Sequence, residues 1–191
     1  MVENMTYEEM IDQEYENSKN RKSDINEHLQ LLKELASECD HVTEMGVRFG
    51  DSTRAFLKAD VTLRSYDIEL NDGVMRLFDA SKRAGKDVEY IKADTRDLEI
   101  EETDLLFIDT WHSYTQLKME LFLHGNKARK YLAFHDTWTY GVKDESWDKN
   151  RTAVGTEGLI PAIVRFVIDN PEWKFKVFRT NNNGLTVLER G

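Results

Sequence analysis

The sequence has few of the residues that mark secreted, fibrous or membrane proteins. It contains one cysteine, Cys39, in 191 residues, so no disulfide can form within the chain. It contains two prolines, which excludes a proline-rich linker. No apolar run is long enough to cross a membrane, and the first residues lack the basic-then-apolar pattern of a signal peptide. We therefore expect a cytoplasmic protein without a membrane partner.

Positive charge is also scarce. The chain has 26 lysines and arginines against 36 acids, a formal net charge of −10. Surfaces that bind duplex nucleic acid are normally basic, because contacts with phosphates supply much of the affinity. The charge therefore argues against a nucleic-acid duplex as partner and favours small-molecule chemistry. The length and the apolar fraction of 40% suit one globular domain.

Hydrophobic periodicity divides the chain into alternating helices and strands. Two helices come first, and Asp24 with Glu27 has the spacing of a capping box for the second. The turn sequence Asn-Asn-Asn-Gly indicates a hairpin near the end. Helices are expected over 6–18, 24–38, from about 51, 73–84, 114–128 and 158–170. Strands are expected over 41–45, 62–67, 88–94, 104–109, 131–136, 173–179 and 184–189.

This alternation predicts an α/β fold with a Rossmann-like, doubly wound, mostly parallel seven-stranded sheet and an antiparallel hairpin strand at its edge. A single domain is expected over residues 1–191. It comprises N-terminal helices (1–40), a ligand-binding core (41–136), a lid loop (137–156) and a C-terminal helix and hairpin (157–191). The lid interpretation depends on the length of the loop and on Trp138, Tyr140 and Trp147. Alternatively, these aromatics pack beneath the loop or at a dimer contact.

Each of the first five expected strands ends in an acidic residue. In an open parallel sheet these ends share one edge, where ligands bind. One acid there is usually a helix cap or a solvated strand end. Several close together repel one another unless a cation or a donor-rich ligand offsets their charge. The acids are Glu44, Asp67, Asp94, Asp109 and Asp136, the last preceded by His135.

The first strand leads into a glycine turn. Gly46 and Gly50 allow the backbone to approach a ligand, and the amides of the following helix point to the same place. Asp67 lies about 20 residues further on, where an acid can hold ribose hydroxyls. The alternative is that Asp67 caps the next helix. The glycine spacing differs from the dinucleotide fingerprint, which argues against a nicotinamide-dependent dehydrogenase.

Two sequence motifs resemble a known family. VTEMGVRFGDSTRAFL resembles motif I of class I S-adenosylmethionine-dependent methyltransferases. IDTWHSYTQLKMEL followed by YLAFHDT resembles the signature of their metal-dependent small-molecule branch, which includes macrolide-sugar and rhamnosyl O-methyltransferases and cephalosporin hydroxylase-like proteins. The resemblance covers residues 24–137. The chain departs from it at Thr110-Trp111, where relatives often have glycine and a small or acidic residue, and at His135, where they often have an acid.

The resemblance implies a role for each matched residue. Asp67 would hold the ribose of S-adenosylmethionine, and Asp94 with Thr95 would lie near the adenine. Asp109 would be a catalytic residue and, with Asp136, bind a divalent metal, Mg²⁺ or Mn²⁺. His135 is a candidate third metal ligand, and His112 the general base. The implied cofactor-binding residues are Glu44, Gly46, Gly50, Ser52, Asp67, Asp94 and Thr95.

These residues suit methyl transfer to an alcohol. A hydroxyl is a poor nucleophile, so a cation that lowers its pKa and a histidine that accepts its proton would both assist. The expected acceptor is a small molecule such as a sugar or a nucleotide-sugar. N-methylation, a hydroxylase-like reaction and a non-enzymatic scaffold remain open, as does a homo-oligomer. Equally, His112 would fit a helix cap, and His135 a buried structural residue.

Overall fold

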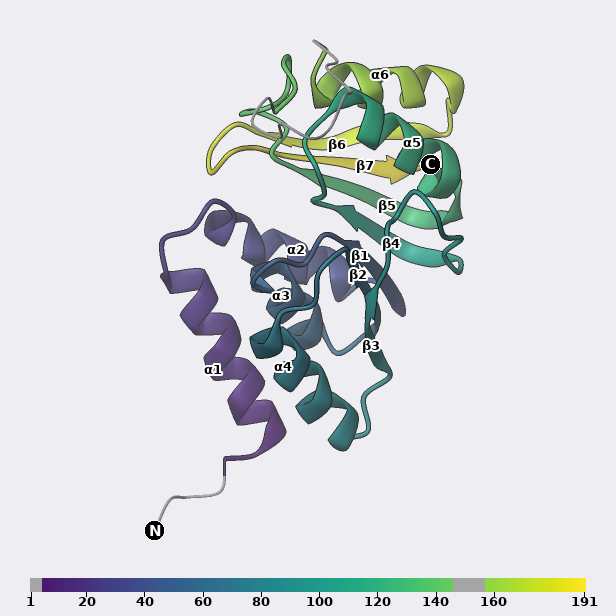
Figure 1. Ribbon diagram of the computed structural model, residues 1–191. Helices are drawn as coiled ribbons and strands as arrows, with labels where there is room; N and C mark the ends of the chain where they lie inside the picture. The colour runs from purple at the N-terminus through teal and green to yellow at the C-terminus, as the bar shows by residue number, and fades with distance from the viewer. Residues whose placement is uncertain (1–4, 146–156) are drawn as a thin grey trace.

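The computed structural model describes residues 5–145 and 157–191 (Figure 1). Its centre is a seven-stranded sheet in the order β3-β2-β1-β4-β5-β7-β6. Strands β1 to β5 are parallel, whereas β7 is antiparallel to both β5 and β6. This confirms the predicted Rossmann-like sheet with an antiparallel hairpin at its edge. The strands are β1 (His41–Met45), β2 (Thr62–Asp67), β3 (Val88–Lys92), β4 (Thr103–Ile108), β5 (Ala128–His135), β6 (Trp173–Arg179) and β7 (Leu185–Arg190).

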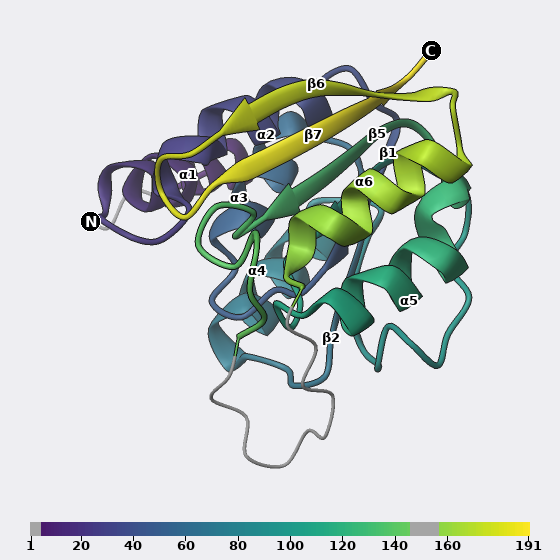
Figure 2. The same cartoon turned by 90° about the horizontal axis from the view of Figure 1, so that it is seen from above.

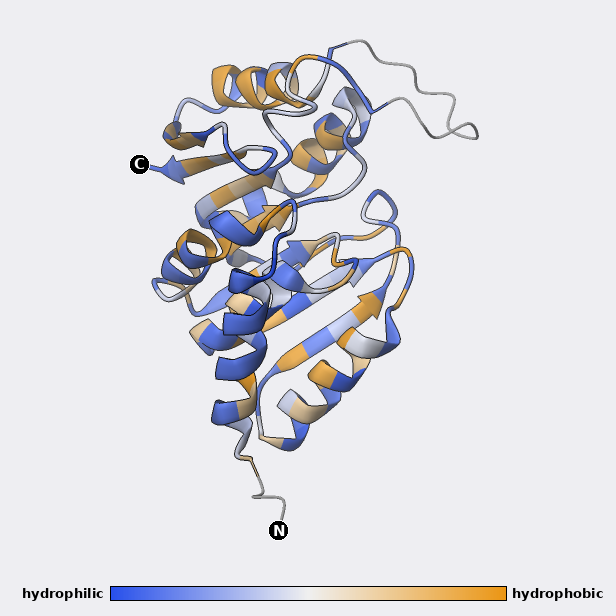
Figure 3. Ribbon diagram, turned by 90° about the vertical axis from the view of Figure 1, so that its left-hand side faces the viewer, coloured by the Kyte–Doolittle hydropathy of each residue, from blue (hydrophilic) through white to orange (hydrophobic). Residues whose placement is uncertain are grey.

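Helices cover both faces of the sheet, as Figure 2 shows. One face is covered by α2, α3 and α4, with α1 packed on α3, and the other by α5 and α6, so that each face has its own apolar core. Figure 3 shows that α6 is largely hydrophobic and α1 mostly hydrophilic. The helices are α1 (Tyr7–Asn20), α2 (Leu29–Ala36), α3 (Asp51–Ala59), α4 (Asp72–Arg83), α5 (Tyr114–His124) and α6 (Leu159–Asp169), with 3-10 turns at Asn26–His28 and Gly125–Lys127.

Strand β4 illustrates why a central strand of the sheet contains a continuous run of apolar residues. All six of its residues are buried. Leu105 and Phe107 enter the core beneath α1 to α4, whereas Leu106 and Ile108 enter the core beneath α5 and α6. Successive side chains of a strand point to opposite faces, so the part of β4 that is covered on both faces has four consecutive apolar residues, Leu105 to Ile108. None of the described helices combines the length and the apolar character needed to cross a lipid bilayer.

The second helix begins differently from the sequence-based prediction. Asp24 and Glu27 do not form a capping box, because a 3-10 turn over Asn26–His28 precedes α2. The amide of Glu27 donates instead to the side-chain oxygen of Asn182, in the turn between β6 and β7, at 2.9 Å. The Asp24 carboxylate pairs with Arg48 at 2.9 Å. A contact between distant segments thus replaces the predicted local cap.

The strand order reverses at β1, which lies between β2 and β4. The chain therefore crosses the sheet after β3 and continues outward in the other direction. Open α/β sheets bind ligands at such a reversal, outside the carboxyl ends of the strands. The acidic residues at or just after the ends of β1 to β5 meet at this edge of the sheet.

Candidate functional site

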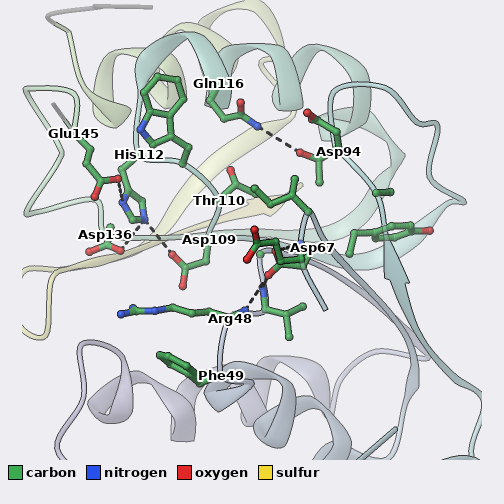
Figure 4. Close-up of a pocket in the computed structure, with 18 of the residues that line it drawn as sticks. Arg48, Phe49, Asp67, Asp94, Asp109, Thr110, His112, Gln116, Asp136 and Glu145 are labelled. Carbon is green, nitrogen blue, oxygen red and sulfur yellow. Dashed lines mark hydrogen bonds and ion pairs between the residues drawn. The ribbon is translucent and has the colours of Figure 1, made fainter. Parts of the chain in front are cut away.

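A cavity of about 830 Å³ opens at the carboxyl ends of the parallel strands (Figure 4). Its volume falls in the range of small-molecule sites. Most of the predicted site residues line it, whereas four lie behind the wall and support it: Glu44, Gly50, Ser52 and His135. The predicted residues that line it are Gly46, Asp67, Asp94, Thr95, Asp109, His112 and Asp136.

Gly46 is required where the glycine turn meets the end of β4. Its φ angle is +85°, and a Cβ atom at this position would overlap the carbonyl oxygen of Asp109. The amide of Asp109 donates to the carbonyl oxygen of Met45 at 2.8 Å, which holds the two segments together. Because only glycine tolerates both the angle and the contact, the sequence at position 46 determines how closely these segments approach.

Glu44 anchors the glycine turn from beneath. Its buried carboxylate accepts hydrogen bonds from the hydroxyls of Ser52 at 2.5 Å, Thr53 at 2.8 Å and Ser65 at 2.5 Å. The first two belong to the first turn of α3, so the carboxylate ties α3 to β1 and β2. Burial raises the pKa of Glu44 to about 7, although these hydroxyls act in the opposite direction. Gly50 precedes α3 with a φ angle of +74°.

Asp67, the last residue of β2, binds the backbone of the glycine turn. Its Oδ2 accepts hydrogen bonds from the amides of Val47 at 2.8 Å and Arg48 at 2.9 Å, and its Oδ1 accepts one from the amide of Glu69 at 3.1 Å. Asp67 does not cap α4, because the side chain of Asn71 occupies that position. A carboxylate has about four acceptor positions, so Asp67 can also accept from a ligand in the cavity.

Asp94 and Thr95 lie on the side of the cavity near α5. The Asp94 carboxylate binds Arg96, whose Nε donates at 2.9 Å. The hydroxyl of Thr95 donates at 2.6 Å to Glu120, a buried acid of α5 that also accepts from Gln116 at 2.7 Å. Burial raises the pKa of Glu120. Sequence reasoning missed Glu120 and Gln116, although Ser113 and Gln116 have the spacing of a capping box.

Asp109, His112 and Asp136 meet at the other end of the cavity. One ligand atom from each lies within 4.8 Å of the others. Nε2 of His112 is 2.8 Å from Oδ2 of Asp136 and 3.3 Å from Oδ1 of Asp109. Asp136 has a φ angle of +59°, and its buried Oδ1 has no hydrogen-bond partner among the described residues. A strained backbone and an unsatisfied carboxylate oxygen are features of functional sites.

The charges of this cluster are strongly coupled. Burial opposes protonation of His112, but hydrogen bonds to Asp109, Asp136 and Glu145 raise its pKa to about 12. Burial also disfavours the charged carboxylates, yet His112 and His135 hold the pKa values of Asp109 and Asp136 below their usual range. The carboxylates therefore hold the pKa of His112 well above its ordinary value.

The two ring nitrogens of His135 face different parts of the molecule. Nδ1 lies 3.3 Å from Oδ1 of Asp109 and 3.2 Å from Oδ2 of Asp136. Nε2 lies 3.0 Å from the carbonyl oxygen of Asp24 and 3.2 Å from that of Asn182. Carbonyl oxygens only accept, so Nε2 carries a proton and Nδ1 is directed at the acids. His135 is thus a buried residue that contacts both acids, and its role as a metal ligand remains a prediction.

The segment after β5 contributes two side chains that hold His112. Oε2 of Glu145 lies 2.9 Å from Nδ1, and the amide of Glu145 donates to the carbonyl oxygen of His112 at 2.9 Å. The ring of Tyr140 stacks on the imidazole at 4.7 Å. Sequence reasoning missed Glu145, which no motif marks. Trp138 packs against Phe178 instead of lining the cavity. Residues 146–156 of the proposed lid, which include Trp147, lie outside the described residues.

Comparisons with known proteins agree with this geometry at the level of the fold. No protein family and no curated protein matches the chain by sequence. Among solved structures, the N-methyltransferase NodS of Bradyrhizobium japonicum with S-adenosylhomocysteine matches at a TM-score of 0.61 and 13% identity, over 97% of this chain and 98% of that one. A methyltransferase of Podospora anserina, also bound to S-adenosylhomocysteine, matches at a TM-score of 0.60 and 13% identity, over 95% of this chain and 87% of that one. An O-methyltransferase family protein of Burkholderia thailandensis matches at a TM-score of 0.62 and 12% identity, over 96% of this chain and 59% of that one.

Proposed function

We propose that this chain is an S-adenosylmethionine-dependent methyltransferase that uses a divalent cation to methylate a hydroxyl of a small molecule. One observation carries the proposal: a single cavity holds a glycine turn bound to Asp67 and, beside it, the cluster of Asp109, His112 and Asp136. The first feature suits an adenosine cofactor, and the second suits activation of an acceptor. The fold shared with S-adenosylmethionine-dependent O- and N-methyltransferases supports the same activity.

The cofactor would occupy the part of the cavity formed by the ends of β1, β2 and β3. Asp67 would accept hydrogen bonds from the ribose hydroxyls, and Asp94 with Thr95 would lie near the adenine. Gly46 would let the backbone approach the cofactor. The surplus of acids in the wall suits a positively charged sulfonium. The residues behind the wall would act indirectly, by shaping the glycine turn: Glu44, Gly50 and Ser52.

The residues of the cluster fit a divalent cation. Asp109 and Asp136 would hold it, and the buried, unpaired Oδ1 of Asp136 is the feature that favours a cation most directly. Carboxylate oxygens suit Mg²⁺, and Mn²⁺ is the second candidate. His135 is the candidate third ligand, because its Nδ1 lies within 3.3 Å of both acids.

The cluster also places a proton acceptor beside the proposed cation site. A bound cation supplies the positive charge that lowers the pKa of an acceptor hydroxyl. With their charge offset by such a cation, Asp109 and Asp136 would favour the protonated form of His112 less. Its Nε2 would then accept the hydroxyl proton, while Glu145 holds Nδ1 and orients the ring. The cavity wall aligns the acceptor with the methyl group.

The acceptor we propose is a small hydroxylated molecule such as a sugar or a nucleotide-sugar. N-methylation is the second candidate, because one of the matching structures is an N-methyltransferase. A methyl-transfer screen with radiolabelled S-adenosylmethionine over sugars, nucleotide-sugars, catechols and amines separates these possibilities. A hydroxylase-like enzyme or a scaffold would transfer no label to any of them.

Thermal unfolding tests cofactor and metal together. We expect S-adenosylhomocysteine, but not NAD, to raise the melting temperature, and Mg²⁺ or Mn²⁺ to raise it further. Asp136→Asn removes one carboxylate charge from the cluster and should abolish the metal effect while the cofactor effect remains. Asp79→Asn changes an exposed acid on α4 and serves as the matched control. The proposal fails if neither S-adenosylhomocysteine nor a metal shifts the melting temperature.

Turnover with an acceptor from the screen tests the assignment of the base. His112→Ala should lower kcat by about 10²- to 10⁴-fold, the usual contribution of a general base, without loss of cofactor binding. Glu145→Gln keeps an acceptor near Nδ1 but removes the charge, so a smaller loss of about tenfold is expected. Unchanged turnover in His112→Ala would show that another group takes the proton.

A further inference from the structure

One cationic side chain at the cavity has no role in the proposed chemistry. Among the described residues that line the cavity, only Arg48 and Arg96 are arginine or lysine. Arg96 is bound to Asp94 through both Nε and Nη2. In Figure 4 the side chain of Arg48 extends below Asp109 toward the end of the cavity that holds Asp136. Arg48 thus brings positive charge to a wall in which acids predominate.

The ion pair of Arg48 within the chain is weak. Its Nη1 lies 2.9 Å from Oδ2 of Asp24, but 71% of the Arg48 side chain and 40% of the Asp24 side chain are exposed. Exposed pairs of this kind contribute little to stability, since water and salt screen them. An anionic ligand that reaches the cavity can therefore replace Asp24 at small cost, and a guanidinium binds carboxylate or phosphate through two parallel hydrogen bonds.

The backbone of Arg48 is unusual as well. Its φ angle is +52°, in the left-handed region that non-glycine residues rarely adopt. The backbone of Arg48 is held in this conformation because its amide donates a hydrogen bond to Oδ2 of Asp67 at 2.9 Å. Glycine or asparagine would fit this conformation with less strain. An arginine at a strained position on the wall of a cavity indicates a side chain that acts on a ligand.

We propose that Arg48 is an anion-binding residue of this cavity, which takes a carboxylate or phosphate group of a bound ligand in exchange for Asp24. Two ligands can supply such a group: the amino-acid part of the cofactor, or an acidic acceptor. The first source rests on the proposed function, whereas the second can be tested without it. Phe49, which also lines the cavity, has its ring centroid 5.2 Å from the Arg48 guanidinium carbon and so contributes a second exposed contact to this side chain.

Calorimetric titration of the full chain distinguishes the two sources. The first arm compares S-adenosylhomocysteine with 5′-methylthioadenosine, which lacks the amino-acid part. The second arm titrates inorganic phosphate into protein with and without S-adenosylhomocysteine at constant ionic strength. The variant is Arg48→Asn, because asparagine tolerates the left-handed conformation. Arg48→Lys keeps the charge, and Arg96→Gln removes the other arginine of the wall as a control.

Because Arg48→Asn loses a charge-assisted hydrogen bond to the anion, we expect its dissociation constant to be about tenfold larger than that of the wild-type chain. A loss of affinity for S-adenosylhomocysteine but not for 5′-methylthioadenosine assigns the anion to the cofactor. A loss of phosphate affinity in the presence of S-adenosylhomocysteine assigns it to the acceptor. In both cases the melting temperature of the free variant should not fall, and Arg48→Lys should keep part of the affinity. Unchanged affinities in both arms, or an equal loss in Arg96→Gln, overturn the inference. Failure of the wild-type chain to bind either nucleoside refutes the proposed cofactor instead, while the phosphate arm still decides on Arg48.

Discussion

Glu44 predicts an unusual dependence of stability on pH. Its carboxyl is fully buried, and burial raises its pKa from 4.5 to about 7, against hydrogen bonds from Ser52, Thr53 and Ser65. In the unfolded chain the same group ionises near its ordinary value. Between these two values the unfolded chain releases a proton that the folded chain retains. The contribution of Glu44 to stability is therefore complete below pH 4.5 and is lost as the pH rises to about 7.

The magnitude follows from the same shift. One pKa unit corresponds to about 1.4 kcal/mol, so the full effect is about 3 kcal/mol, and about 2 kcal/mol of it falls between pH 5.5 and 8. This is a large part of the 5 to 15 kcal/mol that stabilises a typical domain. Glutamine has the shape of protonated glutamate and does not ionise. Glu44→Gln should therefore remove this part of the pH dependence and be more stable than the wild-type chain at pH 8.

The assay is urea unfolding of the wild-type chain and Glu44→Gln at several pH values between about 5.5 and 8. The difference between the two chains cancels the titration of all distant groups. Glu101→Gln changes an exposed acid and should give a difference that does not vary with pH. A constant difference for Glu44→Gln would refute the reasoning, since it would mean that the three hydroxyls keep Glu44 ionised throughout.

Two further predictions concern contacts between distant segments. Gly46→Ala should lower the melting temperature much more than Gly85→Ala, because both glycines have positive φ but only the first Cβ would meet the backbone of Asp109. If the two variants lost a similar amount of stability, only the strain of a positive φ angle would matter, and this strain costs about 1 to 2 kcal/mol. Asn182→Ala should cost about 1 to 2 kcal/mol in urea unfolding, because the amide of Glu27 loses its acceptor and alanine is strained at the φ angle of +48°; an unchanged midpoint would contradict this.

The fold follows from features that one sequence displays. The alternation of short apolar runs with helical periodicity predicts the parallel strands, because β1, β4 and β5 are mostly buried and the exposure of β3 at the sheet edge also follows its local composition. The start of α2 could not be predicted in the same way. The sequence offers a plausible cap in Asp24, but the structure uses Asn182, and a pairing across more than 150 positions leaves no local signal.

The candidate site likewise contains residues that the local sequence predicts and residues that it does not. The acids Asp67, Asp94, Asp109 and Asp136 are predictable, because each ends or closely follows a predicted strand and parallel strands end at a common edge. Glu145 was missed because it lies in an irregular segment whose path the sequence does not specify. The pKa of His112 was also unpredictable, since it depends on three carboxylates from different segments.

The position of His135 has a consequence for the order of folding. Its Nε2 contacts carbonyl oxygens of Asp24 and Asn182, and its Nδ1 contacts Asp109 and Asp136. Contacts that span so much of the sequence form slowly, because large loops must close first. The parallel strands can associate before the last hairpin docks, but Asn182 cannot reach His135 until it does. The cluster of Asp109, His112 and Asp136 is therefore expected to be among the last parts of the molecule to form. Refolding should restore secondary structure before it restores the contacts of His135 with Asp109 and Asp136.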